Sequence, residues 1–329
     1  MTKKRILSGM RPTGKLHLGH LVGALANWVK LQESYQCFFM VADWHALMSE
    51  YEDPREMALN SHEVARDMLA AGIDPEKSVL FIQSHVPEHL ELAMIFSVLT
   101  PLSWLERCPT YKEQLRDLAG RDLTTYGFLG YPVLQAADIA VYKANAVPVG
   151  VDQLPHLELA REIIRRFHSL YKKQIFPEPE PLLTKTPKLV GLDNRKMSKS
   201  LGNFIALSDP PEEITKKVSQ MITDPERIKL KDKGHPDICS LFSYYAIFSD
   251  ANKKDEVRAW CEGALIGCTE CKKRLAQVLI ELLEPVRKKR EALTDKKVEE
   301  ILREGAKKAR KAAAETLAEV KRAINLVAE

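Results

Sequence analysis

The chain has 329 residues, of which 45% are hydrophobic and 29% charged, and its formal net charge is only +4. This length and composition allow a large core and suit one large domain with a smaller one beside it. No apolar run approaches the roughly 20 residues of a membrane span, and the basic start lacks the apolar stretch and cleavage site of a signal peptide. We therefore expect a soluble, cytoplasmic protein with no membrane partner.

Short apolar runs alternate with helical patterns through the first half of the chain. The apolar runs predict strands at 6–9, 37–41, 79–83 and 147–149. Helical spacing of apolar residues predicts helices at 21–35, 54–71, 87–99, 132–143 and 156–167. This alternation is typical of an α/β fold with a doubly wound parallel sheet, in which ligands bind beyond the carboxyl ends of the strands. After residue 200 helical patterns take over.

A glycine-punctuated segment, Arg11-Pro-Thr-Gly-Lys-Leu-His17-Leu-Gly19-His20, follows the first predicted strand and opens a helix. Unpaired backbone N–H groups and the helix dipole make such a terminus attractive to phosphate. Gly9, Gly14 and Gly19 would let the backbone approach a nucleotide closely. His17 and His20 lie three residues apart, so both imidazoles can donate to phosphoryl oxygens as negative charge shifts.

A second segment, Lys196-Met-Ser-Lys-Ser200, lies among glycine, aspartate, asparagine and serine residues typical of a loop. Two ammonium groups there can neutralise a departing pyrophosphate. Either segment alone is a weak signal, because isolated histidines and Lys-Ser runs are usually surface features. The two in this order and context predict an ATP site.

Together these segments resemble the HxGH and KMSKS signatures of class I aminoacyl-tRNA synthetases. Four further segments, at residues 8–14, 81–84, 136–139 and 147–153, resemble tryptophanyl-tRNA synthetases in order and spacing over nearly the whole chain. The resemblance implies a Rossmann-type catalytic domain with a smaller all-helical anticodon-binding domain. It also implies a homodimer that uses Mg-ATP, L-tryptophan and tRNA(Trp), with no DNA partner.

The resemblance also assigns roles to individual residues. The implied catalytic residues are His17, His20, Lys196 and Lys199. The implied ATP-binding residues are Arg11, Pro12, Thr13, Gly19, His20, Gly150, Val151, Asp152, Leu189, Lys196, Met197, Ser198, Lys199 and Ser200. The implied tryptophan-binding residues are Leu7, Gly9, Asp138 and Gln153.

Asp138 carries the expected amino acid specificity. In the family an aspartate at this place accepts a hydrogen bond from the indole N–H, and an ionised carboxylate is an acceptor only. Phenylalanine would leave such a buried acceptor unpaired and would be rejected strongly without editing. Outside the surrounding motifs, Asp138 would read as an ordinary aspartate of a helix.

Three positions depart from the commonest bacterial pattern of the family. Arg11 replaces a usual glutamine, His20 a usual asparagine and Val151 a usual glutamate. All three belong to the expected ATP side, so the detailed contacts there are open. His20 restores the more general class I signature and keeps a donor in place.

The resemblance divides the chain into three parts. Residues 1–205 form the catalytic domain, in which about 99–130 are the connecting insertion that makes the dimer contact. Residues 206–285 form the helical anticodon-binding domain. Residues 286–329 have 13 Lys or Arg against 8 Asp or Glu, and their apolar positions recur at helical spacing. They predict an amphipathic helix packed on the body, with a basic excess that can attract RNA.

Four cysteines cluster in the second half, spaced as Cys239, Cys261, Cys268 and Cys271. Structural disulfides are not expected in the cytoplasm, which leaves a metal site, a cluster or free thiols. Zinc sites usually pair two CxxC-like knuckles, and only one is present, whereas an iron–sulfur cluster tolerates uneven spacing. The pattern resembles a subset of tryptophanyl-tRNA synthetases that hold a [4Fe-4S] cluster. We expect that cluster, with zinc as the alternative.

Three other functions fit part of this pattern. A tyrosyl-tRNA synthetase shares both signatures but usually carries a further C-terminal RNA-binding module. Another nucleotidyl transferase could share the first signature alone. A non-catalytic paralogue could sense tryptophan or bind RNA, although the four signature histidines and lysines favour an enzyme.

Overall fold

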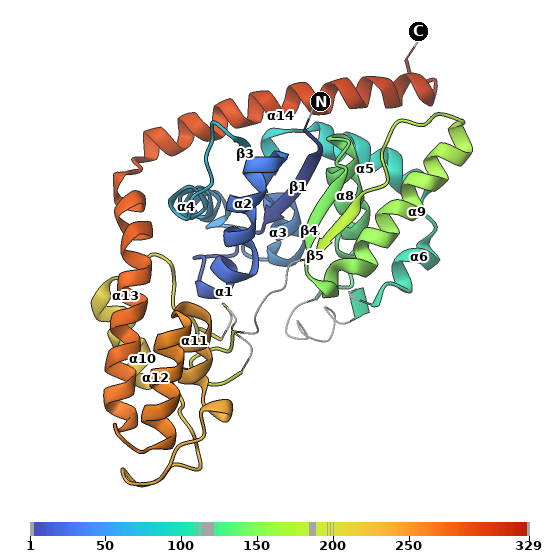
Figure 1. Ribbon diagram of the computed structural model, residues 1–329. Helices are drawn as coiled ribbons and strands as arrows, with labels where there is room; N and C mark the ends of the chain where they lie inside the picture. Colours follow the sequence, from blue (N-terminus) through green and yellow to red (C-terminus); the bar gives the residue numbers. More distant parts are fainter. Residues whose placement is uncertain are drawn as a thin grey trace.

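The computed structural model describes residues 3–109, 111–112, 122–183, 189–195, 197, 199 and 201–327. At its centre lies a five-stranded sheet of order β3-β2-β1-β4-β5, in which all neighbouring strands are parallel (Figure 1). The strands are β1 (Arg5–Met10), β2 (Gln36–Val41), β3 (Ser78–Ile82), β4 (Ala146–Val149) and β5 (Glu180–Leu183).

Helices cover both faces of this sheet (Figure 1). They are α1 (Leu18–His20), α2 (Ala26–Ser34), α3 (Asp43–Glu50), α4 (Met57–Ala70), α5 (Glu88–Leu99), α6 (Leu102–Glu106), α8 (Tyr126–Val141) and α9 (Leu154–Tyr171). Alternate strand residues enter different cores: Ile6 and Phe39 belong to one, Leu7 and Phe38 to the other. Strands β1 and β2 are therefore buried on both sides, as expected for the centre of a doubly wound sheet.

The predicted parallel α/β sheet is confirmed, and each end of the first four strands lies within one residue of its predicted position. Strand β5 and the short helices α3 and α6 were missed. Strand β5 lies in a proline-rich segment that predicted only a connection, and α3 is a short helix between β2 and α4. The helix predicted at 132–143 starts earlier, at Tyr126, with Thr125 as its N-cap.

A separate helical part follows the sheet in sequence and extends away from it (Figure 1). It contains α10 (Pro211–Gln220), α11 (Ser240–Phe248), α12 (Ala251–Glu262) and the long α13 (Cys268–Ala292). The border expected at residues 285 and 286 falls inside α13, which continues through Pro285. The end of α13 reaches α4, so this helix joins the helical part to the sheet domain.

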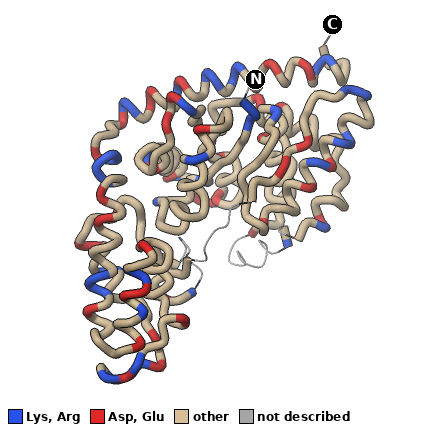
Figure 2. Tube along the Cα trace, viewed as in Figure 1, with Lys and Arg blue, Asp and Glu red and all other residues tan. Residues whose placement is uncertain are grey.

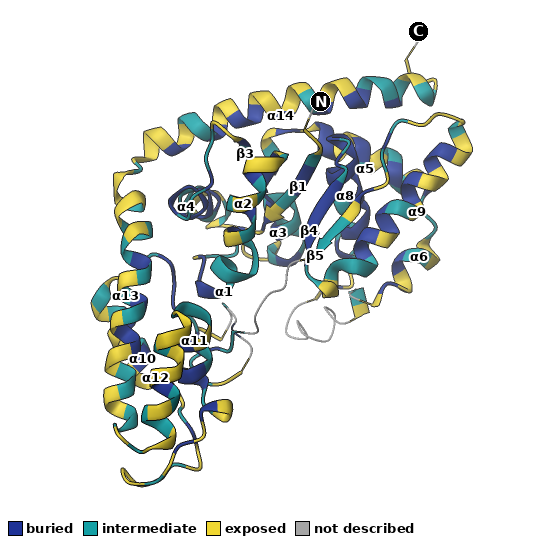
Figure 3. Cartoon of the chain, viewed as in Figure 1, coloured by how far each residue is buried: buried dark blue, intermediate teal, exposed yellow. Residues whose placement is uncertain are grey.

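The last helix, α14 (Asp295–Ala323), runs across the sheet domain (Figure 1). Its buried residues recur at helical spacing, which confirms the amphipathic helix predicted for this segment (Figure 3). Acidic and basic residues alternate along it (Figure 2), and several pair with the body, including Lys143 with Glu319 at 2.7 Å. Among the described residues, no helix is both long and apolar enough to cross a membrane.

Candidate functional site

A cavity of about 380 Å³ opens beyond the carboxyl ends of β1 and β4. Strands β1, β2 and β4 and helices α3 and α8 contribute its walls. The four expected tryptophan-binding residues, Leu7, Gly9, Asp138 and Gln153, all line it. The other walls are largely apolar or aromatic: Met40, Met48, Phe128, Tyr131, Ile139, Val147 and Val149. A flat aromatic ligand with one polar edge suits such a lining.

Gly9 is required by the close approach of β1 and β2 at the cavity wall. A Cβ at this position would lie 2.8 Å from Met40 Cγ. Because Met40 also lines the cavity, any larger residue at Gly9 would push it into the ligand space.

Asp138 lies in α8 and is fully buried. Three side chains donate to its carboxylate: His45 Nε2 at 2.7 Å, His89 Nδ1 at 2.6 Å and Gln83 Nε2 at 2.8 Å. Gln83 Nε2 also donates to Oδ2 at 3.0 Å, so both carboxylate oxygens are held in place, and Asp138 lines the cavity. Burial raises the pKa of Asp138, but His89 and His45 outweigh it, and the pKa lies below its usual value. Asp138 is thus an ionised acceptor in the cavity wall.

Sequence reasoning missed the partners of Asp138. Gln83 belongs to a segment that carried the resemblance, but it received no role. His45 lines the cavity, and His89 lies behind Asp138 with its Nε2 2.7 Å from the Tyr142 hydroxyl. Nothing in their spacing along the chain signals a contact, because α3, the turn after β3, α5 and α8 come together only in the folded domain.

Gln153 is also held in a fixed orientation. His156 Nδ1 lies 3.1 Å from Gln153 Oε1 and donates to it, and His156 Nε2 lies 2.6 Å from the Tyr131 hydroxyl. Burial lowers the pKa of His156 to about 4, so its ring is neutral at pH 7. The amide nitrogen of Gln153 donates to Asp152 Oδ2 at 2.8 Å.

The first signature begins the helix as predicted, with His17 as N-cap of α1. Helical structure continues through a π-helical stretch at Leu21–Leu25 into α2. The backbone N–H of Gly19 donates to His17 Nδ1 at 3.2 Å, and that of His17 donates to His20 Nδ1 at 3.1 Å. Both Nδ1 atoms are acceptors, so each neutral ring carries its proton on Nε2.

The two signature imidazoles stay neutral. Burial, with Lys199 as a second cause, lowers the pKa of His17 to about 4. Burial lowers the pKa of His20 well below its usual value, helped by His17 and Lys199. Two neutral rings with Nε2–H groups are hydrogen-bond donors at pH 7 without any added charge. Gly19 allows this arrangement, because its Cβ would lie 3.0 Å from the His17 ring.

Lys199 of the second signature contacts the first. Its Nζ donates to the Gly14 carbonyl at 2.8 Å and lies 3.4 Å from Thr13 Oγ1. Burial and Arg11 lower the pKa of Lys199 to about 8. Behind this contact, His17 pairs with Ala206 in an isolated antiparallel bridge. Residues far apart in sequence are thereby joined at one edge of the sheet.

The other expected ATP residues surround this contact. Arg11 and Gly150 line the main cavity, and Pro12 and Thr13 line a neighbouring cavity of about 550 Å³. Val151 is 68% exposed beside Asp152, Met197 lies near Gly19, and Leu189 packs against the core. Lys196, Ser198 and Ser200 lie outside the described residues, as does part of the expected insertion at 99–130.

The four clustered cysteines meet in the helical part. Cys239, Cys261, Cys268 and Cys271 line one small cavity of about 20 Å³, together with Arg227 and Trp260. A Cβ at Gly234 would lie 2.4 Å from Cys261 Sγ, so the glycine keeps this side open. Among the described residues, no group of three or more potential ligands has the geometry of a metal-ion site. Cys37 and Cys108 are buried elsewhere.

A doubly wound sheet with two signature segments meeting at its carboxyl edge, beside an amino acid-sized cavity, defines a class I aminoacyl-tRNA synthetase. The family model described as "tRNA synthetases class I (W and Y)" matches residues 2–284. The chain belongs to this family, on its tryptophanyl-tRNA synthetase branch.

Known relatives are similar over the full length. The tryptophan–tRNA ligase of Thermotoga maritima is 51% identical, covering 98% of this chain and 99% of the relative. That of Aquifex aeolicus is 45% identical, covering 98% of this chain and all of the relative. Among solved structures, tryptophanyl-tRNA synthetase from Campylobacter jejuni, complexed with ADP and tryptophan, has a TM-score of 0.89 at 34% identity and covers 98% of this chain and 99% of its own.

Proposed function

We propose that the chain is an ATP-dependent tryptophan–tRNA ligase. It converts L-tryptophan and Mg-ATP to tryptophanyl-adenylate and diphosphate, and then transfers tryptophan to the 3′ end of tRNA(Trp) in protein synthesis. The buried, ionised Asp138 in the wall of the apolar cavity is the observation that carries the substrate assignment.

In the first step a carboxylate oxygen of tryptophan attacks the α-phosphorus of ATP, and the bond to the bridging oxygen breaks as diphosphate leaves. His17 and His20 donate from Nε2 to the phosphoryl oxygens as charge grows there, supported by their low pKa and fixed tautomers. The ammonium groups of Lys196 and Lys199 neutralise the charge of the departing diphosphate. Such positioned donors supply much of the rate without a protein nucleophile.

Two different sets of residues bind the two substrates, tryptophan and ATP. Leu7, Gly9 and Asp138 hold the indole, and Gln153 meets the amino or carboxyl group of tryptophan. The remaining expected residues, including Arg11, Gly150 and Asp152, hold ATP. His45 joins the indole side, because it lines the same cavity and its Nε2 lies 2.7 Å from Asp138 Oδ2.

The enzyme acts as a homodimer. Large apolar side chains are exposed on α5 and α6, where Met94 is 64%, Val98 74% and Leu102 61% exposed. They adjoin the expected dimer insertion at 99–130. A surface patch of this kind suits a second copy of the chain. The helical part at 206–285 serves as the anticodon-binding domain, residues 286–329 pack on the body, and the enzyme works in the cytoplasm, where tRNA is charged.

The four cysteines hold a [4Fe-4S] cluster with a structural role. The donor set supports it: four thiols and no imidazole line one cavity beside the open space at Gly234. The cavity of about 20 Å³ has room for roughly one water, so the thiols must turn outward around a cluster. Zinc would instead draw four sulfurs to about 2.3 Å from one ion.

The cluster is tested by anaerobic reconstitution. Iron and sulfide in equal amounts, with brown absorbance, are expected for the unaltered chain. In Gly234→Ala the added Cβ would lie 2.4 Å from Cys261 Sγ, and loading should fall sharply. Gly127→Ala, where nothing lies within 4 Å, is the matched control. One zinc per chain, with no iron, would show that the four cysteines bind zinc and not a cluster.

The function is tested by charging a tRNA(Trp) transcript with radiolabelled amino acid. We expect tryptophanyl-tRNA to form with ATP and magnesium, and no product with tyrosine. Tryptophan binding without ATP turnover would instead indicate a non-catalytic sensor, and charging of tRNA(Tyr) would indicate the tyrosine branch.

A further inference from the structure

Asp67 of α4 is a buried carboxylate outside the reaction described above. It is 1% exposed, and both of its oxygens are used. Oδ2 accepts from the backbone N–H of Leu16 at 3.3 Å, and Oδ1 accepts from Arg290 Nε at 2.7 Å. Leu16 directly precedes His17, and Arg290 lies near the end of α13. One side chain therefore links the first signature to the helix that leads to the helical part.

Leu16 is a joint between the two signature segments. Its carbonyl accepts from the N–H of Leu207, at 2.9 Å, in the segment that follows the second signature. Leu18 N–H likewise donates to the Ile205 carbonyl at 3.1 Å. Leu16 is fully buried, so its N–H has no access to water as a substitute for Asp67. The hydrogen bonds of Leu16 and Leu18, the two neighbours of His17 in the chain, thus fix its backbone.

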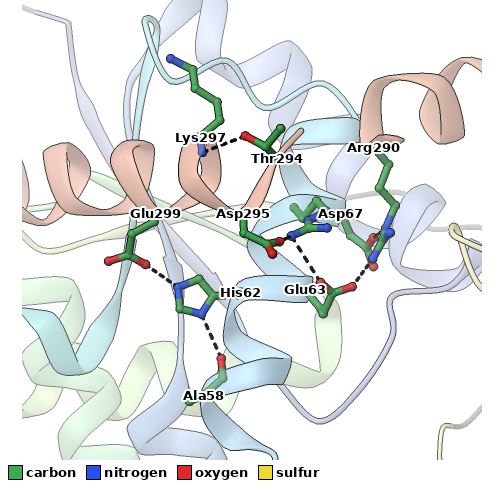
Figure 4. A network of polar contacts seen from close by, with 10 residues as sticks. Ala58, His62, Glu63, Asp67, Arg290, Thr294, Asp295, Lys297 and Glu299 are labelled. Atoms are coloured by element: carbon green, nitrogen blue, oxygen red, sulfur yellow. Dashed lines mark hydrogen bonds and ion pairs between the residues drawn. The ribbon is translucent and has the colours of Figure 1, made fainter. Parts of the chain in front are cut away.

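Arg290 orients Asp67 and opposes its protonation (Figure 4). Burial raises the pKa of Asp67, and the hydrogen bond and charge of Arg290 oppose that rise. Arg290 is itself anchored, since its guanidinium also pairs with Glu63 one turn earlier in α4. Asp67 in turn contributes to the field at Lys199, where its charge favours the protonated amine.

We propose that Asp67 is a positioning residue for the nucleotide site, held by Arg290, and that it fixes His17 and Lys199 for ATP. The proposal rests on the proposed ligase function. Asp67 touches no substrate; it acts through the backbone of Leu16 and through its charge. Because Arg290 belongs to α13, the position of α13 affects how Asp67 is held.

The same helices offer a matched control. Arg66 of α4 pairs with Asp295 at the start of α14. Neither residue contacts the signature backbone. Asp295→Asn therefore removes an ion pair between α4 and α14 but leaves Leu16 held.

The test compares Asp67→Asn, Arg290→Gln, Arg290→Lys and Asp295→Asn in tryptophan-dependent ATP–pyrophosphate exchange. Asparagine offers one acceptor oxygen and can serve either Leu16 or Arg290. We expect the KM for ATP to rise at least ten-fold in Asp67→Asn and Arg290→Gln, with the Kd for tryptophan within two-fold of the unaltered chain. Arg290→Lys should recover part of the loss, and Asp295→Asn should match the unaltered chain.

Amide hydrogen exchange of peptides spanning Leu16 gives a readout that needs no activity. Faster exchange there in Asp67→Asn and Arg290→Gln, but not in Asp295→Asn, is expected. An unchanged KM for ATP, or equal rises in the KM for ATP and the Kd for tryptophan, would overturn the proposal. If the unaltered chain showed no pyrophosphate exchange, the proposed function would fail, and hydrogen exchange at Leu16 would decide the positioning role separately.

Discussion

His89 Nδ1 lies 2.6 Å from Asp138 Oδ1, and both side chains are completely buried. The imidazole fixes the carboxylate from the side away from the cavity, and its other nitrogen pairs with the Tyr142 hydroxyl. Together with His45 and Gln83 it keeps a charge in an apolar wall, where an unpaired carboxylate would be costly. A fixed, ionised acceptor of this kind is what the proposed indole site requires.

Asp138→Asn should weaken tryptophan binding by about 10- to 100-fold. The amide turns a donor toward one of the three donors that now face the carboxylate, and an unsatisfied buried group costs about 1–3 kcal/mol. Equilibrium dialysis with labelled tryptophan measures the change. Tyr142→Phe removes only the outer hydrogen bond and should alter the Kd less than Asp138→Asn. Equal affinity of Asp138→Asn and the unaltered chain would remove Asp138 from the indole site.

At position 20 the two residues used by the family should be nearly interchangeable. His20→Asn keeps an acceptor for the His17 N–H and a donor for phosphate, so the exchange rate should stay within about ten-fold. His20→Leu removes both, and loss of one such donor typically costs about 10²- to 10³-fold in kcat. Pre-steady-state adenylate formation reports the difference. Similar rates for Leu and Asn would show that His20 contributes no donor.

The low pKa of Lys199 predicts a basic limb in the pH profile. Since the pKa of this lysine is lowered to about 8, its ammonium is present below that pH and is lost as the pH rises through it. kcat/KM for ATP, which reports the free enzyme, should fall above pH 8 with the loss of one proton. Lys199→Arg keeps its charge and should give a lower but flat profile. If kcat/KM of Lys199→Arg still fell above pH 8, the fall would come from the titration of another group.

At Gly305 the requirements of packing and of helix propensity oppose each other. It lies in α14 against the edge strand β3, and a Cβ there would lie 1.8 Å from the Leu80 carbonyl oxygen. Helix propensity alone predicts that Gly305→Ala gains about 1 kcal/mol, but overpacking of this kind costs about 1–3 kcal/mol. We expect the urea midpoint to fall. Gly130→Ala in α8, with nothing within 4 Å, should leave it unchanged or raise it. A rise in Gly305→Ala would mean that α14 moves off the strand.

The sequence predicts the parts of this molecule in which local pattern and tertiary structure agree. The runs that became β1 to β4 are largely apolar, as expected of strands covered by helices on both faces. Strand β5 escaped prediction because it lies in a proline-rich segment and contains Pro181, which suggests a loop. Helix α3 is too short for its apolar spacing to stand out.

The candidate site divides in the same way. His17, His20 and Lys199 belong to short motifs that can be recognised in the sequence. The fold then brings them close to one another. The partners of Asp138 and the link from Asp67 to Arg290 join residues that are distant in sequence, for which one chain offers no local signal. The cysteines were singled out by spacing, and their common cavity appears only when α11, α12 and α13 pack together.

The central claim is that this site activates tryptophan, and pyrophosphate exchange with each of the twenty amino acids in turn tests it most directly. The account predicts exchange with tryptophan, little or none with the others, and its loss in Asp138→Asn at low tryptophan concentration. Exchange driven by tyrosine, or by no amino acid while tryptophan still binds, would contradict it.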